Sequence, residues 1–255
     1  MQFIDTHTHN SDSAFEGEED LVIRAGLEAG VTKMIQADVD SSERSRMFGL
    51  VKKYPGVLYP MLGLYPGSVG SNWREEVEEL DKWRSQGVVA IGEIGLDYHY
   101  SKDTADLQKE ALAAQFELAA QWDLPVNIHL REATEDFFDI LEAHKSLGLR
   151  GNLHAFSGSY ETFMRIQKYG DWRIGVGGVV TFKKAGLAEV VRKVPLERIV
   201  LETDSPYLTP VPFRGERNDS SKIPYIAAKI AELQETDIES VAAITTQNAS
   251  VLFGI

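Results

Sequence analysis

The sequence predicts a single-domain α/β protein, a TIM-type (β/α)8 barrel that spans residues 1–255. Eight short apolar runs recur along the chain, and segments with a helical period separate them. The runs are continuously apolar, as expected for strands that are buried on both faces. A doubly wound sheet is the competing architecture, but no Gly-x-Gly-x-x-Gly turn follows the first run.

The eight apolar runs are the expected strands, in the order of the chain. They cover residues 3–5, 33–37, 57–64, 88–92, 126–129, 151–154, 173–176 and 198–201. Between them, residues such as Leu112 and Phe116, or Ile226 and Ile230, recur on one helical face. The proline-rich stretch 205–212 is expected to be a stiff functional loop. Residues 236–239 have the form of a capping box, with Thr236 as the cap of a final helix that closes the outer ring.

Composition excludes several kinds of site. The chain has no cysteine, so it has no disulfide, thiolate nucleophile, iron-sulfur cluster or cysteine-based zinc finger. Any metal must therefore be bound by nitrogen and oxygen. With 26 basic and 39 acidic residues the net charge is -13, which disfavours a broad phosphate-binding groove. Bound divalent ions can invert the local field, so a nucleic-acid substrate is still compatible with this charge.

The chain shows no sign of membrane insertion or export. No apolar run approaches the roughly 18 residues of a membrane-spanning helix. The first ten residues reach a charge at Asp5 and lack a signal-peptide pattern. We therefore expect a cytoplasmic protein with no membrane partner. The oligomeric state is left open, and a monomer is compatible with the sequence.

Histidines provide the first chemical signal. His7 and His9 are two residues apart, so in an extended segment they project to the same side and could reach one metal ion. Two histidines in a surface loop would be the alternative. Four of the six histidines lie at the ends of predicted strands, where the side chains of a barrel converge: His7, His9, His129 and His154. His99 and His144 are expected at the surface.

Carboxylates follow the same pattern. Glu93 follows the fourth predicted strand and Asp204 follows the eighth. An unpaired buried charge costs several kcal/mol, and a metal ion would remove that cost; a salt bridge or a helix cap is the alternative. Four imidazoles and two acids suit two-metal hydrolysis, with Glu93 and Asp204 as catalytic candidates and Asp204 as the base. Asp97 and Glu202 are expected to orient ligating imidazoles.

A few cationic residues are candidates for substrate binding. Arg131 lies two residues after His129, and Arg214 and Arg217 lie beyond the last predicted strand. Arginine forks suit phosphate oxygens. The alternatives are an ion pair of Arg131 with Glu132 or Glu135, and a solvated surface for the other two arginines.

Together these motifs resemble the TatD family of metal-dependent deoxyribonucleases, within the amidohydrolase-like barrels. The resemblance covers nearly the whole chain. It rests on DTHTH at 5–9, GEIGLDY at 92–98, QF at 115–116, LPV at 124–126, HLREA at 129–133, HAFSG at 154–158, ETDSPYL at 202–208, RGERN at 214–218 and NA at 248–249.

The resemblance implies that the site holds two divalent metal ions, which could be zinc, magnesium or manganese. It assigns His7, His9, Glu93 and Asp204 to one ion, and Glu93, His129 and His154 to the second, so that Glu93 is shared. Many relatives have Gly-x-His-Pro after the third strand, where this chain has Gly-Leu-Tyr-Pro at 63–66. Tyr65 therefore stands in place of an imidazole, as a candidate substrate contact.

The leading hypothesis is a metal-dependent hydrolase with DNA as substrate, a deoxyribonuclease acting as a 3'-5' exonuclease. Hydrolysis of a small amide, ester or lactone is the first alternative, and the acidic surface and Tyr65 suit it. A metal-stabilised binding protein without catalysis is the second.

Overall fold

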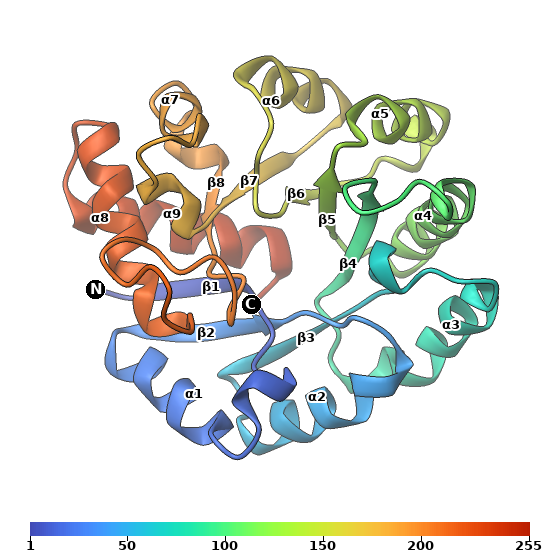
Figure 1. Ribbon diagram of the computed structural model, residues 1–255, viewed down its shortest axis with the longest axis horizontal. Helices are drawn as coiled ribbons and strands as arrows, with labels where there is room; N and C mark the ends of the chain where they lie inside the picture. The colour runs from blue at the N-terminus through green and yellow to red at the C-terminus, as the bar shows by residue number, and fades with distance from the viewer.

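A sheet of eight parallel strands, in sequential order from β1 to β8, forms the centre of the computed structural model, which describes residues 1–255. The strands are β1 (Phe3–Thr8), β2 (Val31–Gln36), β3 (Leu58–Leu62), β4 (Ala90–Asp97), β5 (Val126–Arg131), β6 (Gly151–Leu153), β7 (Trp172–Val176) and β8 (Ile199–Leu201). Figure 1 shows the strands at the centre with helices around them. The sheet is nearly closed, which confirms the predicted (β/α)8 barrel.

Nine α-helices accompany the strands. They are α1 (Glu19–Glu28), α2 (Ser41–Lys53), α3 (Trp73–Glu79), α4 (Ala105–Trp122), α5 (Thr134–Ala143), α6 (Tyr160–Ile166), α7 (Leu187–Val191), α8 (Ile223–Leu233) and α9 (Ile238–Phe253). The predicted apolar faces are buried: Leu112 and Phe116 in α4, and Ile226 and Ile230 in α8, are all 0% exposed. None of the helices combines the length and apolar composition needed to cross a membrane.

Each predicted strand overlaps an observed one, but three strands continue beyond their predicted carboxyl ends. β1 extends to Thr8, β4 to Asp97 and β5 to Arg131. His7 and Glu93 therefore lie within strands rather than after them. The ladder to the neighbouring strand sets these ends, since Thr8 still pairs with β2 and Asp97 with β5. Apolar composition marks burial, whereas hydrogen bonding to the neighbour decides where a strand ends.

The barrel closes between β1 and the segment that follows β8. Thr6 Oγ1 donates to the Leu201 carbonyl at 3.0 Å. Beyond β8, the backbone N–H of Asp204 donates to the His7 carbonyl at 3.0 Å, and that of His9 donates to the Ser205 carbonyl at 2.9 Å. This seam brings the first and last predicted metal ligands together, although they are far apart in the chain.

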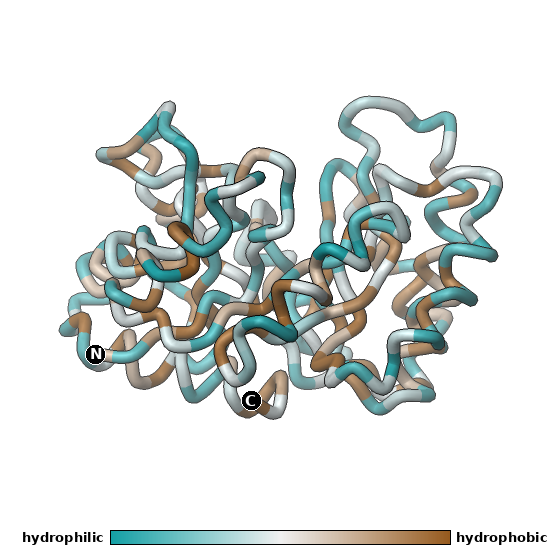
Figure 2. Tube along the Cα trace, turned by 90° about the horizontal axis from the view of Figure 1, so that it is seen from below, coloured by the Kyte–Doolittle hydropathy of each residue, from teal (hydrophilic) through white to brown (hydrophobic).

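The last helix covers the amino-terminal end of the barrel. Leu252 and Phe253 share a buried cluster with Ile4 of β1 and Ala90 of β4. These two strand residues each lie three positions before a predicted metal ligand, so the cluster lies below the ligands. α9 also packs against α8, β1 and β8, as a helix of the outer ring does. Figure 2 shows both termini at the edge of the molecule that lies away from the long loops.

The cap of α9 differs from the predicted one. The Asp237 side chain accepts from the Ser240 N–H at 2.6 Å, so Asp237 is the N-cap and Thr236 is not. The Thr236 N–H instead donates to the Ala231 carbonyl at 3.0 Å, within the turn that ends α8. The helix therefore begins one residue later than the capping-box pattern indicates.

Replacing Phe253 with alanine should lower the free energy of unfolding by about 3–5 kcal/mol, because it opens a cavity beneath the barrel. Phe253 is 4% exposed, whereas Val251 in the same helix is 60% exposed. Val251→Ala should therefore change stability by less than about 0.5 kcal/mol. Chemical denaturation followed by circular dichroism measures both variants. Equal stability of the two would show that α9 does not seal the barrel.

Candidate metal centre

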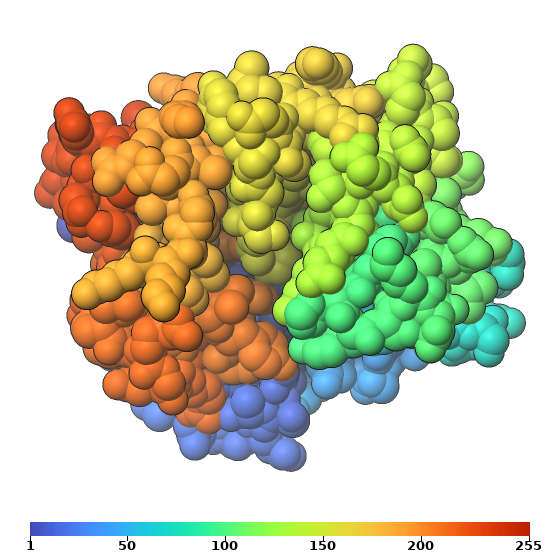
Figure 3. Space-filling model, turned by 45° about the horizontal axis from the view of Figure 1, so that its top comes forward, coloured from blue at the N-terminus to red at the C-terminus, as the bar shows by residue number.

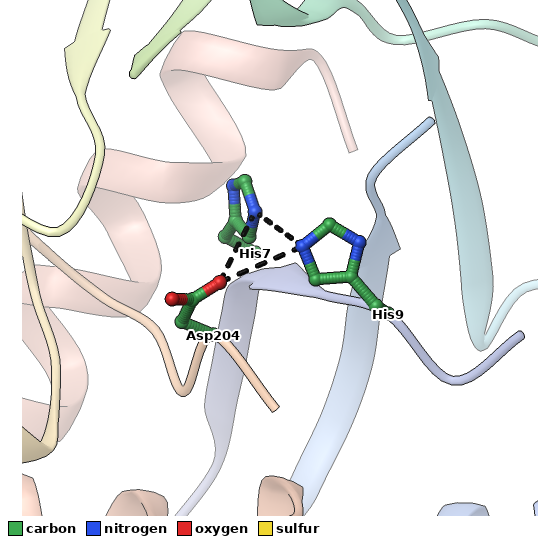
Figure 4. Close-up of side chains that lie close together, drawn as sticks. All are labelled: His7, His9 and Asp204. Atoms are coloured by element: carbon green, nitrogen blue, oxygen red, sulfur yellow. Dashed lines mark hydrogen bonds and ion pairs between the residues drawn. The ribbon is translucent and has the colours of Figure 1, made fainter. Parts of the chain in front are cut away.

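Three side chains from the first and last strands meet at the carboxyl end of the barrel. His7 lies in β1, His9 directly after it, and Asp204 three residues after β8. His7 Nε2 lies 3.1 Å from His9 Nε2 and 3.6 Å from Asp204 Oδ1. His9 Nε2 lies 3.5 Å from the same oxygen. Figure 4 shows the three groups pointing toward one another.

These separations suit a single metal ion. Ligand atoms about 2.1 Å from an ion lie about 3.0 Å apart at a right angle and about 3.4 Å apart at the tetrahedral angle. The observed separations run from 3.1 to 3.6 Å. Two imidazole nitrogens that face each other also need a proton or a cation between them, because their lone pairs repel. The nitrogen and carboxylate donors therefore fit a divalent ion.

Glu93 of β4 lies between two sets of imidazoles. Its Oε2 lies 3.4 Å from His7 Nε2 and 3.7 Å from His9 Nε2. Its Oε1 lies 2.8 Å from His129 Nδ1 and 3.6 Å from His154 Nε2. One carboxylate oxygen therefore faces each set. His7, Glu93 and His154 also form a compact group that could hold a metal ion.

The outer nitrogens of two imidazoles have carboxylate partners. Asp97 Oδ2 lies 3.0 Å from His129 Nε2, and Glu202 Oε1 lies 3.1 Å from His154 Nδ1. Carboxylates in this position orient a metal-ligating imidazole and raise its basicity. Both acids therefore lie against imidazoles of the site, as the sequence predicts.

Two buried amides, which no sequence motif marks, hold the outer nitrogen of His7. His7 Nδ1 lies 2.9 Å from Asn127 Oδ1, and Asn127 Nδ2 donates to Asn152 Oδ1 at 3.1 Å. Because the Asn127 nitrogen is used toward Asn152, its oxygen is the atom that accepts from His7 Nδ1–H. The lone pair of His7 Nε2 then faces the other donors. Both amides are 0% exposed, inside strands that are otherwise apolar.

Asp5 joins β1 to the segment after β8 beneath the site. Its Oδ1 accepts from the Thr203 N–H at 3.0 Å, and its Oδ2 accepts from the Thr203 hydroxyl at 2.6 Å and the Ser220 hydroxyl at 2.7 Å. Burial raises the pKa of Asp5 to about 7, although these hydrogen bonds oppose the shift. Asp204, which directly follows Thr203, has a left-handed φ of 56°. Such a backbone costs about 1–3 kcal/mol, and these hydrogen bonds hold the segment in place.

Burial and charge act in opposite directions on the site. Burial favours neutral imidazoles, yet the carboxylates around them prevail and raise the pKa of His129 to about 9 and that of His154 to about 10. Burial would raise the pKa of Glu93, but the imidazoles hold it well below its ordinary value. Burial lowers the pKa of His7, so near neutral pH the protonated imidazoles of the metal-free centre include His129 and His154, and a divalent cation can replace their protons.

Tyr65 lies beside the centre. Its ring is edge-on to that of His129, with 5.2 Å between the ring centroids. Burial, followed by the negative charges of Glu93 and Asp97, raises the pKa of the Tyr65 phenol, so it stays protonated. The phenol is therefore a hydrogen-bond donor at the edge of the site. Its contact with a substrate stays a prediction.

Arg131 ends β5 and has no carboxylate within 4.0 Å of its guanidinium. The two ion pairs that were alternatives for it do not form. Glu132 pairs with His99, and Glu135 pairs with Arg165. Arg131 is therefore free to bind an anion close to the centre.

The other two predicted substrate-binding arginines contact neighbouring side chains. Arg217 pairs with Glu18 and donates to the Ala14 carbonyl, which ties the loop after β8 to the segment after β1. The Arg214 guanidinium carbon lies 3.8 Å from the centroid of the Phe182 ring. A role of either arginine toward a substrate stays a prediction.

Comparison with known proteins shows likeness over nearly the whole chain. A family model described as TatD related DNase matches residues 4–254. YabD of Bacillus subtilis, an uncharacterised metal-dependent hydrolase, is 37% identical over 253 residues, which is 98% of each chain. The 3'-5' ssDNA/RNA exonuclease TatD of Erwinia amylovora is 31% identical and covers 94% of this chain and 95% of its own. The crystal structure of the Escherichia coli TatD homologue YjjV has a TM-score of 0.92 and 31% identity, covering 99% of this chain and 98% of that one.

Asn127→Leu removes the acceptor of His7 Nδ1–H and should weaken metal binding by about 10- to 100-fold. Asn127→Asp is the matched control, because it keeps an acceptor oxygen and should retain more of the affinity. Competition with a zinc-binding dye gives both affinities, after thermal denaturation has shown that the variants are folded. Equal zinc affinity of Asn127→Leu and wild type would show that His7 does not need this partner.

Metal binding should release protons from the centre. Because the pKa of His129 is raised to about 9 and that of His154 to about 10, both imidazoles are protonated below these values in the metal-free protein. An ion must displace these protons, so zinc affinity should rise as the pH increases toward about 9. Titration calorimetry in two buffers of different ionisation enthalpy counts the protons. No release near neutral pH would contradict this charge state.

Proposed function

Because the chain belongs to the TatD family of metal-dependent hydrolases, we propose that it is a deoxyribonuclease that removes nucleotides from the 3' end of DNA with two divalent ions. The position of Glu93 carries this proposal. Its two oxygens face different imidazoles, as a carboxylate shared by two ions requires. The name of the Erwinia amylovora relative supports the direction of cleavage.

We assign the donors to two sets that share Glu93, as the family resemblance implies. The first ion would be held by Glu93, His7, His9 and Asp204. The second would be held by Glu93, His129 and His154. Zinc, manganese and magnesium are the candidate ions. Imidazole and carboxylate together accept zinc and manganese, whereas magnesium prefers more oxygen ligands.

Asp204 is the residue we assign as the proton acceptor. Divalent ions, when bound, polarise the scissile phosphate and lower the pKa of the attacking water. The Asp204 side chain is 16% exposed, compared with 5% for Glu93 and 0% for Glu202. It is therefore the most accessible of these three carboxylates to water. Its ionised oxygen accepts the proton as the water attacks phosphorus.

Tyr65 and Arg131 supply the polar contacts for the substrate phosphate. The protonated phenol of Tyr65 lies beside His129 and would donate a hydrogen bond to a phosphate oxygen. The unpaired guanidinium of Arg131 provides a planar fork that matches two phosphate oxygens. Arg131 gives local positive charge to a chain whose net charge is -13, and Tyr65 adds a neutral donor.

Hydrolysis of a small ester, amide or lactone by the same centre is the competing function. The excess of acidic residues favours it, because a net-negative surface repels a polyanion at long range. Such substrates would be turned over without inhibition by DNA. Added single-stranded DNA therefore separates the two functions in one assay.

Wild-type protein with manganese, magnesium or zinc should shorten a 5'-labelled single-stranded oligonucleotide from its 3' end. Asp204→Asn should lower the rate by about 100-fold or more, because the proton acceptor is lost. His129→Ala should abolish shortening. A 3'-terminal phosphorothioate should block degradation if the polarity is as proposed.

His144→Ala is the matched control. His144 follows α5 as its C-cap, and its Nδ1 lies 2.8 Å from the Ile140 carbonyl, away from the centre. This variant should degrade the oligonucleotide at the wild-type rate. Metal-dependent degradation no greater than that of His129→Ala would reject the nuclease.

A further inference from the structure

A cavity of about 370 Å³ lies beside the metal centre, between the segments that follow β5 and β6. Figure 3 shows the surface hollowed between the yellow residues after β6 and the yellow-green and green residues after β5 and β4. Its polar lining includes Arg131, Thr134, His154, Ser157 and Thr162. Because His154 belongs to the centre, a molecule in this cavity would lie next to the bond that is cut.

Arg131 is fixed in place but has no ion-pair partner. The Arg131 carbonyl accepts a hydrogen bond from the Tyr98 N–H at 3.0 Å. The Arg131 backbone is also the β-ladder partner of the Asp97 backbone, between β5 and β4. The backbone thus holds it two residues beyond His129. The guanidinium carbon lies 5.5 Å from the centroid of the Tyr100 ring. An unpaired arginine in contact with an aromatic ring suits an anion attached to a planar group.

Tyr100 provides that aromatic surface. Its side chain is 86% exposed, the largest value among the exposed large hydrophobic residues of this chain. The ring meets that of His99 edge-on, with the two ring centroids 4.8 Å apart, and folding does not bury it. A solvent-exposed ring beside a cationic group is the arrangement on which bases of single-stranded nucleic acids stack.

One acidic residue also lines the cavity. Glu132 Oε1 lies 2.6 Å from His99 Nδ1, so its charge is directed to that imidazole. The hydroxyls of Thr134, Ser157 and Thr162 add neutral hydrogen-bonding groups. The cavity therefore combines a guanidinium and hydroxyls, which suit a phosphate, and the exposed Tyr100 ring lies next to that guanidinium.

We propose that this cavity binds the nucleotide next to the scissile phosphodiester of a single-stranded nucleic acid. Arg131 and the hydroxyls bind its phosphate, and Tyr100 stacks on its base. The inference rests on the proposed nuclease function and adds to it the residues that select single strands. A base in a duplex is already stacked and paired, so it is not available to Tyr100.

Binding of a fluorescent single-stranded oligonucleotide, measured by anisotropy with manganese, tests this site. The parent protein is Asp204→Asn, whose degradation of the probe should be slower by about 100-fold or more, so that binding is measured on the intact probe. Adding Tyr100→Ala should weaken binding by about 5- to 150-fold, the range for the loss of one stacked base. Tyr100→Phe keeps the ring and should restore the affinity. Tyr225 is 46% exposed on α8, outside the cavity, and Tyr225→Ala should have no effect.

Salt dependence separates the two contacts. Arg131→Gln should reduce the slope of log affinity against log salt concentration by about 0.7, as expected for one lost phosphate contact on a single strand. Tyr100→Ala should leave the slope unchanged. Affinities and slopes equal to those of the parent in both variants would overturn the cavity proposal, even if the wild type shortens DNA. Failure of the wild type to degrade DNA, with probe binding that still depends on Tyr100, would instead reject only the nuclease function.

Discussion

The balance of charge in the partly dehydrated mouth of the barrel is the constraint on which the whole site depends. The side chains of Glu93 and Glu202 are 5% and 0% exposed, and each lies against an imidazole. A buried carboxylate without such a partner would cost several kcal/mol. The imidazoles in turn need protons or a cation between them, since their nitrogens lie as close as 3.1 Å. Metal binding and the titration of the centre are therefore one coupled equilibrium.

The fold makes this concentration of charge possible by fixing the groups before any ion arrives. Asp5 joins β1 to the segment that carries Asp204, and Asn127 holds the outer nitrogen of His7. Asp5 and Asn127 lie within strands, and their hydrogen bonds hold the groups around the candidate centre in place, so the donor atoms lose little freedom on binding a metal. At the other end of the barrel, α9 covers the interior with apolar residues. The centre thus opens to solvent at the carboxyl end of the strands, away from α9.

The acidic character of the chain and a polyanionic substrate are compatible because the relevant charges are local. Most acidic residues are distributed over the surface, whereas Arg131 stands beside the centre with no carboxylate within 4.0 Å. Salt screens distant charges within roughly 10 Å, so groups in direct contact decide whether a phosphate binds. In the proposed nuclease, the cavity at Arg131 and the exposed Tyr100 would recognise the substrate beside the centre, and the donors that face the metal would serve hydrolysis.

The hydrophobic pattern alone determined the barrel, because strands covered on both faces must be apolar along their length, and each predicted strand overlaps an observed one. The histidines that meet at the candidate centre could also be predicted, since they follow or end apolar runs whose carboxyl ends meet in a barrel, while their role as ligands stays a prediction. Strand ends and the partners of His7 and Asp5 were decided by the tertiary structure. Asn127 lies 120 residues from His7, and Ser220 lies 215 residues from Asp5. Such contacts depend on the register between strands, and a polar residue inside an apolar run does not reveal which distant group it will meet.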